Sequence, residues 1–207
     1  EEAFMQPLRK VISKLKLRAS YGQVGNANLG GRRFAYLSTI TDDYETLNMY
    51  KWGLDSSYGL TGMAEGEFAV QDLTWEIVNK MNLGVELGFL NGMIDLQLDY
   101  FDERRKDIFM PRESVPMTAG FMKQPWKNFG KVTNQGVEVS LNVNKQFGKD
   151  LFVSLMGTFT YAHNEITEKD EPSAVVGTNR AETGHPVGQL TGYIAEGLFT
   201  ADDFEDV

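Results

Sequence analysis

The side chains that could carry chemistry are few, and they are not arranged as a catalytic or metal centre. Cysteine is absent, and the only histidines, His163 and His185, are not in a spacing that holds zinc. The glycine-rich residues 25–31 lack the Lys-Ser/Thr pair that completes a phosphate-binding loop. The acid pairs Asp42-Asp43 and Asp202-Asp203 could contact Ca²⁺, but they lack the ligand spacing of an EF-hand. We therefore predict no catalytic residues, no metal and no cofactor, and we expect that the chain is not an enzyme.

The net charge of −9 is concentrated toward one end of the chain. From Glu165 onward there are ten acids and two bases, whereas residues 1–164 are almost neutral. The sequence has no basic stripe, which argues against a nucleic-acid partner. The acidic end is typical of a solvated loop, or less commonly of a cation or partner site.

The elements that would position any site are strands in which polar and apolar residues alternate. We predict strands over residues 14–24, 74–90, 93–104, 136–144 and 151–163, although Phe152 and Met156 interrupt the alternation of the last one. The 21 Gly, 13 Phe and 8 Tyr suit an all-β protein with many tight turns. No apolar run is long enough for a transmembrane helix, but strands can cross a membrane with their hydrophobicity hidden by alternation.

The dipeptide Asn91-Gly92 predicts a two-residue type I′ hairpin, because both central positions of that turn need a positive φ. Folding the chain about this turn places Leu90 opposite Met93 and sorts both strands by polarity. The apolar face then pairs Phe89 with Ile94, Leu87 with Leu96, Val85 with Leu98 and Leu83 with Tyr100. The polar face pairs Gly88 with Asp95, Glu86 with Gln97 and Gly84 with Asp99. A single register that separates these residues by polarity indicates a β-hairpin.

Short and long connections alternate along the chain. Residues 91–92 and 145–150 join strands closely, while residues 25–73, 106–135 and everything after Asn164 are long. An outer-membrane barrel has short periplasmic turns and long outer loops, whereas a compact sandwich rarely needs such loops. Tyr21, Tyr100 and Tyr161 each end the apolar face of an outward strand, which predicts an aromatic girdle at one height. The pattern favours part of a transmembrane β-barrel; the alternative is a surface or soluble carbohydrate-binding β-sandwich.

Several blocks of the sequence resemble SusC/RagA-type TonB-dependent receptors. They are LKLRASYGQVGN (15–26), LTWE (73–76), NLGVELGF (82–89), DYFDERRKDI (99–108), NFGKVTNQGVEVS (128–140), FTYAHNEI (159–166), GHPVG (184–188) and GYIAEGLF (192–199). The blocks follow the order of the family and cover nearly the whole chain from Leu15 onward. Together they are far more specific than any one of them.

The resemblance implies a plugged barrel of about 22 strands that imports glycans or peptides across the outer membrane of a Bacteroidetes bacterium. It also implies a SusD-like surface lipoprotein as a lid and the TonB complex as the energy source. The sequence has no counterpart of the plug domain or the TonB-contacting segment, and it has too few strands to close a barrel. We therefore expect residues 1–207 to be one stretch of the barrel wall. The expected partners are the lipoprotein, TonB through the absent plug region, outer-membrane lipid and the glycan or peptide ligand.

Two groups of residues are candidates for function in such a barrel. The polar strand residues that would face the lumen are Lys16, Arg18, Glu86, Asp95, Gln97, Asp99 and Glu138. They either bond to one another and to the plug, which we prefer, or border the transport path. The aromatic residues that would lie in outer loops are Tyr44, Tyr50, Trp52, Tyr58, Trp126 and Phe129. These could contact ligand or lipoprotein, or they could form the small cores that long loops need.

Overall fold

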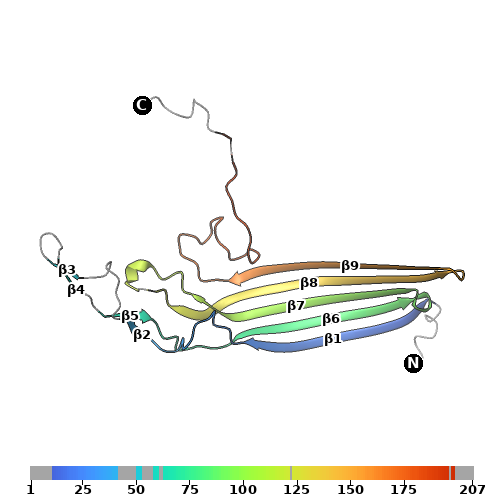
Figure 1. Cartoon of the computed structure of the whole chain (residues 1–207), viewed down its shortest axis with the longest axis horizontal. Helices are drawn as coiled ribbons and strands as arrows, with labels where there is room; N and C mark the ends of the chain where they lie inside the picture. The colour runs from blue at the N-terminus through green and yellow to red at the C-terminus, as the bar shows by residue number, and fades with distance from the viewer. Residues whose placement is uncertain are drawn as a thin grey trace.

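The chain forms one large antiparallel sheet. The computed structural model describes residues 11–41, 50–52, 58–60, 63–121, 123–195 and 197–198. The long strands are β1 (Ile12–Asn26), β6 (Glu76–Phe89), β7 (Ile94–Pro111), β8 (Trp126–Phe147) and β9 (Leu151–Glu168). They lie side by side in the order β1-β6-β7-β8-β9, so each pairs with the long strand before it in the sequence (Figure 1). This up-and-down order confirms the predicted all-β architecture.

Short elements occupy the connections between the long strands. β2 (Thr39–Thr41) pairs with β5 (Ala64–Glu67), and β3 (Tyr50–Trp52) pairs with β4 (Tyr58–Leu60). The 3₁₀ turns are η3 (Leu90–Gly92) and η4 (Met117–Ala119). The predicted long connection 25–73 therefore contains strands of its own. Across the described residues, no helix has both the length and the apolar character needed to cross a bilayer.

The predicted register of the first hairpin is confirmed, but its turn is longer than expected. β6 pairs with β7 from Phe89 opposite Ile94 through Leu83 opposite Tyr100, as the polarity pattern requires. Asn91 and Gly92 have positive φ values of 56° and 85°, but so does Leu90, at 55°. Leu90 therefore leaves the extended conformation, and its N–H donates to the carbonyl of Val11 at 3.2 Å. As a result the connection spans residues 90–93 instead of two residues.

β7 and β8 extend well beyond the strands predicted from the alternation, whereas β6 is slightly shorter than predicted. β7 continues to Pro111 and β8 begins at Trp126, so only residues 112–125 connect them, and the predicted loop over 106–135 is wrong. The ladder between these strands shifts register near Asp107, whose φ is +58°. Beyond the tyrosines both faces of the sheet carry polar side chains. Polar and apolar residues alternate only where one face of a strand meets apolar and the other polar surroundings. The alternation is therefore lost there although the ladder continues.

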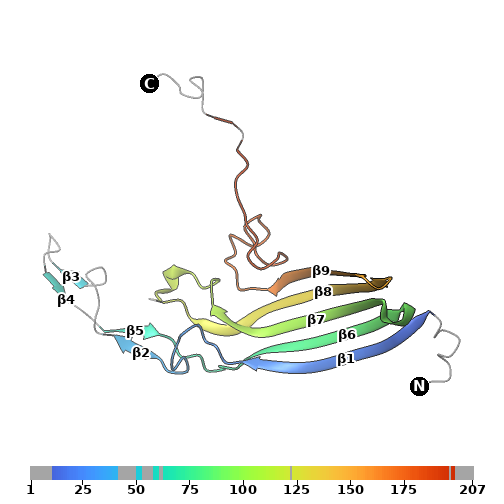
Figure 2. The same ribbon diagram turned by 45° about the vertical axis from the view of Figure 1, so that its right-hand side comes forward.

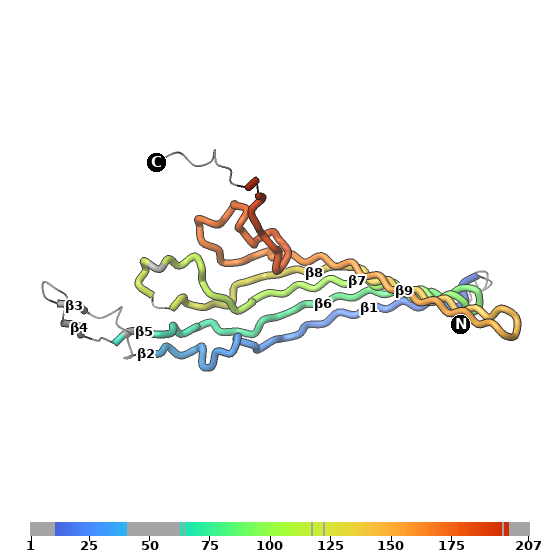
Figure 3. The backbone as a smooth tube through the Cα atoms, turned by 45° about the horizontal axis from the view of Figure 1, so that its top comes forward, coloured from blue at the N-terminus to red at the C-terminus, as the bar shows by residue number. Residues whose placement is uncertain are grey.

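The sheet is a single curved layer (Figure 2, Figure 3), and the side chains on its two faces are unlike. On one face the apolar side chains are uncovered: Leu17 is 73% exposed, Leu155 62% and Phe159 61%. Among the described residues the only buried hydrophobic side chains are Ala35, Val70, Val78 and Ile166. These residues lie in the connections or at the strand ends nearest them. The described residues thus form no second sheet over the apolar face, contrary to what a β-sandwich requires.

The ends of the sheet differ as the connection lengths predict. Figure 1 shows the short turns at one end and the long connections at the other. β1, β7 and β9 run toward the long connections, while β6 and β8 run back (Figure 1). Tyr100 and Tyr161 lie in one row, both opposite Val137. Tyr21 instead pairs with Met81, which lies opposite Asp102, so it sits two residues further toward the long connections. The predicted common row therefore holds for two of the three tyrosines.

Candidate functional site

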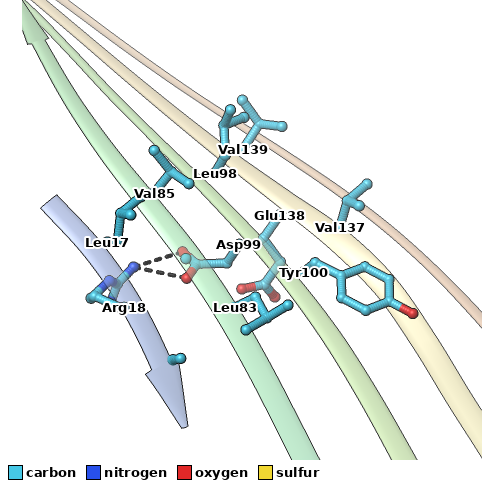
Figure 4. Close-up of a pocket in the computed structure, with 12 residues that line it drawn as sticks. Leu17, Arg18, Leu83, Val85, Leu98, Asp99, Tyr100, Val137, Glu138 and Val139 are labelled. Carbon is cyan, nitrogen blue, oxygen red and sulfur yellow. Dashed lines mark hydrogen bonds and ion pairs between the residues drawn. The ribbon is translucent and has the colours of Figure 1, made fainter. Parts of the chain in front are cut away.

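An ion pair bridges three strands on the polar face. Arg18 of β1 donates through Nη2 to both carboxylate oxygens of Asp99 of β7, at 2.8 and 2.9 Å. The side chains of Arg18 and Asp99 reach each other across β6 (Figure 4). They meet over Gly84, where an added Cβ would collide with Asp99 Oδ1. Gly84 therefore makes room for a bridge that spans two strand spacings. Only 8% of Asp99 is exposed, because the arginine covers it.

Glu86 contacts all three cationic side chains of β1. Its carboxylate lies 2.8 Å from Lys14 Nζ, 3.3 Å from Lys16 Nζ and 3.2 Å from Arg18 Nε. The last contact is at ion-pair distance but lacks the direction of a hydrogen bond, so Arg18 Nε is a buried donor without an acceptor. Glu86 and Asp99 thus neutralise most of the positive charge of β1.

Five of the seven predicted lumen residues belong to this network. Gln97 joins it by donating from Nε2 to Asp99 Oδ2 at 2.8 Å. Asp95 and Glu138 do not join: within the described part of the chain, neither has an ion pair. Asp95 lies opposite Asn142, and Glu138 lies opposite Asp99 on one side and Thr160 on the other. The network supports the interpretation that most of these polar side chains bond to one another.

A second ion pair on the same face was not among the predicted candidates. Lys80 Nζ lies 2.7 Å from Glu103 Oε1, and Asn134 Nδ2 donates to Glu103 Oε2 at 3.4 Å. Lys80 and Glu103 are directly opposite each other in the ladder. Extending the predicted hairpin register three residues beyond Leu83 and Tyr100 would have found this pair.

The apolar face carries a shallow hollow of about 640 Å³ (Figure 4). Apolar side chains from neighbouring strands line it, among them Leu17, Val85, Leu98, Tyr100 and Val139. It offers almost no hydrogen-bonding groups that could orient a polar ligand.

The predicted aromatic candidates fall into two groups. Trp126 has the Arg32 guanidinium 4.2 Å above its ring and Phe109 at 5.1 Å, and Phe129 lies 5.3 Å from the Arg112 guanidinium. Both rings are half-buried, so they hold the connections together. Tyr50 and Trp52 belong to β3 and Tyr58 belongs to β4, while Tyr44 lies outside the described residues.

Asp170 fastens two outer connections together. Its Oδ2 accepts hydrogen bonds from Arg112 Nε at 2.9 Å, from the Ser114 N–H at 3.1 Å and from Ser114 Oγ at 2.9 Å. The residue is only 7% exposed, so the expectation of a solvated acidic loop is wrong for Asp170. Burial raises the pKa of this carboxyl, but the hydrogen bonds from Arg112 and Ser114 outweigh burial and hold the pKa below its usual value. No pattern in the sequence indicates this contact, since Asp170 is separated from its partners by 56–58 residues.

Replacing Asp170 by Asn is expected to raise hydrogen exchange at the Ser114 amide by about tenfold at neutral pH, because charge-assisted bonds become neutral ones. The lowered pKa means that the carboxylate stabilises this contact above about pH 4, and that the effect is lost as the pH falls through the lowered value. Exchange of the wild-type amide, corrected for its intrinsic rate, should therefore rise in the same acidic range. Asp150→Asn, in the turn at the opposite end of the sheet, is the control. Unchanged protection of Ser114 in Asp170→Asn would contradict the contact.

The connection after β9 folds back onto the end of that strand. The Gly184 N–H donates to Ile166 O at 2.8 Å, and the Ile166 N–H donates to His185 O at 3.0 Å. Lys169 Nζ lies 2.7 Å from Glu182 Oε1, and the Glu182 N–H donates to Glu171 Oε1 at 2.5 Å. These bonds make residues 169–189 an ordered unit attached to the sheet. In the parts of the chain that the structure describes, no three metal-ligating side chains are grouped.

Comparison with known proteins decides what this two-faced sheet belongs to. The model of a family described as TonB dependent receptor-like, beta-barrel, matches residues 8–200. The chain belongs to this family. The sheet is therefore a wall segment of an outer-membrane β-barrel, and the alternative of a sandwich is excluded. The family consists of receptors and transporters and is not a class of enzymes.

The relatives are much longer proteins from Bacteroidetes. The TonB-dependent receptor SusC of Bacteroides thetaiotaomicron is 33% identical over 171 residues, which cover 81% of this chain and 16% of SusC. TonB-dependent receptor P39 of Formosa agariphila is 28% identical over 204 residues, covering 98% of this chain and 18% of P39. The chain thus spans less than a fifth of the length of these relatives.

Solved structures agree with the fold. A structure of the RagAB peptide transporter matches with a TM-score of 0.57 and 26% identity, over 77% of this chain and 16% of that chain. The RagAB peptide importer in its 'open-open' state matches with a TM-score of 0.60 and 25% identity, over 82% of this chain and 16% of that chain.

Proposed function

We propose that this chain is part of the wall of a TonB-dependent importer that takes up glycan or peptide nutrients together with a SusD-like surface lipoprotein. The family match over residues 8–200 carries the proposal. The likeness to SusC and to the RagAB transporter supports import as the activity of the parent protein. Its plug domain and TonB-contacting segment would lie outside residues 1–207. No catalytic role is proposed for any residue.

The two faces of the sheet suit a wall between lipid and an aqueous lumen. The exposed apolar side chains would contact acyl chains, which need no hydrogen-bonding partner. The network around Glu86 and Asp99 would stiffen the lumen side by bonding the wall to itself. Among the predicted lumen residues, Asp95 and Glu138 are the carboxylates without an ion pair in the described part of the chain, so they are the ones available to contact the contents of the lumen.

The long connections would form the outer cavity and the seat of the lipoprotein. Trp126 and Phe129 would act by holding these connections in place, since both pack against arginine side chains. Tyr44, Tyr50, Trp52 and Tyr58 remain the candidates for direct contact with ligand or lipoprotein. Aromatic side chains offer large contact area with few rotamers to freeze, which suits both roles.

The test is to purify the tagged parent protein from detergent-solubilised outer membranes and to identify what accompanies it. We expect an integral membrane protein with a surface lipoprotein bound to it. A strain without the parent gene should fail to take up one class of nutrient, glycan or peptide, and regain uptake on complementation. Recovery of the parent alone, with normal uptake of both classes in the deletion strain, would refute the import role.

A further inference from the structure

The connection after β9 forms a cavity, open to solvent and lined mostly by exposed residues, that the wall function does not use. Its volume is about 380 Å³, within the range of small-ligand sites. The polar side chains that line it are Arg180, Glu182, His185, Gln189 and Thr191, and the rest of the lining is small or apolar. The connection that lines the cavity follows β9 at the end of the sheet that carries the long connections (Figure 1), which would be the outer side of the proposed importer.

Backbone hydrogen bonds hold the lining in place. Two turns form it, one closed by the His185 N–H donating to Glu182 O at 3.0 Å and one by the Gln189 N–H donating to Pro186 O at 3.2 Å. Gly184 has a φ of +86°, which favours glycine at this turn. The pair of bonds between Ile166 and residues 184–185 then ties both turns to β9. The backbone of residues 182–189 is therefore fixed before any ligand arrives, which reduces the entropic cost of binding.

The charges around the cavity leave one cation available. Among the described residues that line the cavity, Glu182 is the only acid, and Lys169, itself mostly buried, already neutralises it at 2.7 Å. Arg180 lines the cavity and has no carboxylate within ion-pair distance among the described residues. This is notable in a stretch where, from Glu165 onward, ten acids face two bases. The other polar side chains of the lining, His185, Gln189 and Thr191, can all donate hydrogen bonds.

We propose that this cavity binds a carboxylate group of the ligand, with the Arg180 guanidinium as its main partner. A guanidinium can donate two parallel hydrogen bonds to a carboxylate, and such charge-assisted pairs give both affinity and orientation. Two nutrient sources carry this group: the free C-terminus of a peptide and the uronic acid of an acidic glycan. The biological use of the site rests on the proposed import function, while its binding chemistry does not.

The test is binding of matched probes to the intact parent protein in detergent, measured by titration calorimetry. The carboxylate probes are glucuronate and triglycine, and their neutralised counterparts are glucose and triglycine amide. We expect saturable binding of at least one carboxylate probe and at least tenfold weaker binding of its counterpart. Arg180→Gln should weaken carboxylate binding by about tenfold or more, the size of a lost charge-assisted pair. The probe that binds identifies the source of the carboxylate.

Arg33→Gln is the matched control, because Arg33 is an exposed arginine of another connection, outside the cavity. Arg33→Gln should leave carboxylate binding unchanged. Arg180→Lys should give an intermediate affinity, because lysine keeps the positive charge but cannot donate two parallel hydrogen bonds. Unaltered protection of the Ile166 amide in Arg180→Gln would show that the cavity is intact. Equal binding of carboxylate and neutral probes, equal effects of the two arginine variants, or no saturable binding up to roughly 10 mM would overturn the site. If the site fails these tests while the parent gene is still required for nutrient uptake, the import proposal stands and only the site is refuted. If a carboxylate probe binds but deletion of the parent gene leaves uptake unchanged, the site stands and the import proposal is refuted.

Discussion

Leu87→Arg and Leu96→Arg are each expected to lower the amount of folded parent protein in the outer membrane, at a cost of about 2–4 kcal/mol per substitution. Leu87 and Leu96 lie directly opposite each other, and Leu15 and Leu141 continue the same row on either side. A charge in the middle of this apolar row would face lipid, where it can neither be hydrated nor paired. The measurement is the folded fraction of full-length protein in outer-membrane preparations, with urea unfolding of reconstituted protein giving the free energy.

The control is Gln97→Arg, which adds the same side chain at the position next to Leu96 on the other face. Gln97 lies beside Asp99, and Asp99 faces Glu138 across the ladder, so a cation there meets acids in the proposed aqueous lumen. Its effect should stay below about 1 kcal/mol. Equal losses for Leu96→Arg and Gln97→Arg would show that the assignment of the two faces is wrong.

The part of the fold that could be predicted is the part where each strand has lipid on one face and water on the other. There each residue must match its surroundings, so polarity alone fixed the register of Leu83 to Phe89 against Ile94 to Tyr100. Beyond the tyrosines both surroundings are polar, so polarity does not mark where β7 and β8 end, and their ladder continues to Pro111 opposite Trp126. The predicted strands 93–104 and 136–144 are therefore too short, although the pairing of the hairpin is correct.

The contacts that shape the outer end could not be predicted, for a different reason. Asp170 meets Arg112 and Ser114 only because β8 and β9 bring distant connections together. An isolated acid in an acidic stretch looks solvated until its partners are known. The cavity beside Arg180 could not be predicted for the same reason, since the charge in its lining depends on which acid Lys169 neutralises. Candidate aromatics were chosen by type alone, and type did not distinguish ligand contact from the packing that Trp126 and Phe129 show.

Gly136→Ala is expected to destabilise the wall by about 1–3 kcal/mol, because the added methyl group has no space. A Cβ at this position would overlap the carbonyl oxygen of Tyr161 in β9 and lie 2.6 Å from Phe101 Cζ in β7. The Phe101 ring can turn aside, but the carbonyl belongs to a paired strand and can move only by disturbing the ladder between β8 and β9. The urea midpoint of the reconstituted parent protein should therefore fall.

Gly157→Ala provides a matched comparison one strand away. Gly157 lies opposite Leu141 on the apolar face, and a Cβ built there has nothing within 4 Å. The same substitution should be neutral or stabilising by up to about 1 kcal/mol, since alanine loses less backbone entropy than glycine on folding. The two variants make the same substitution on opposite faces of the sheet, one in a filled space and one in an open space, so their difference in stability reports on the packing of β7, β8 and β9 across Gly136. Equal midpoints for the two variants would mean that the Phe101 ring and the Tyr161 carbonyl do not occupy that space.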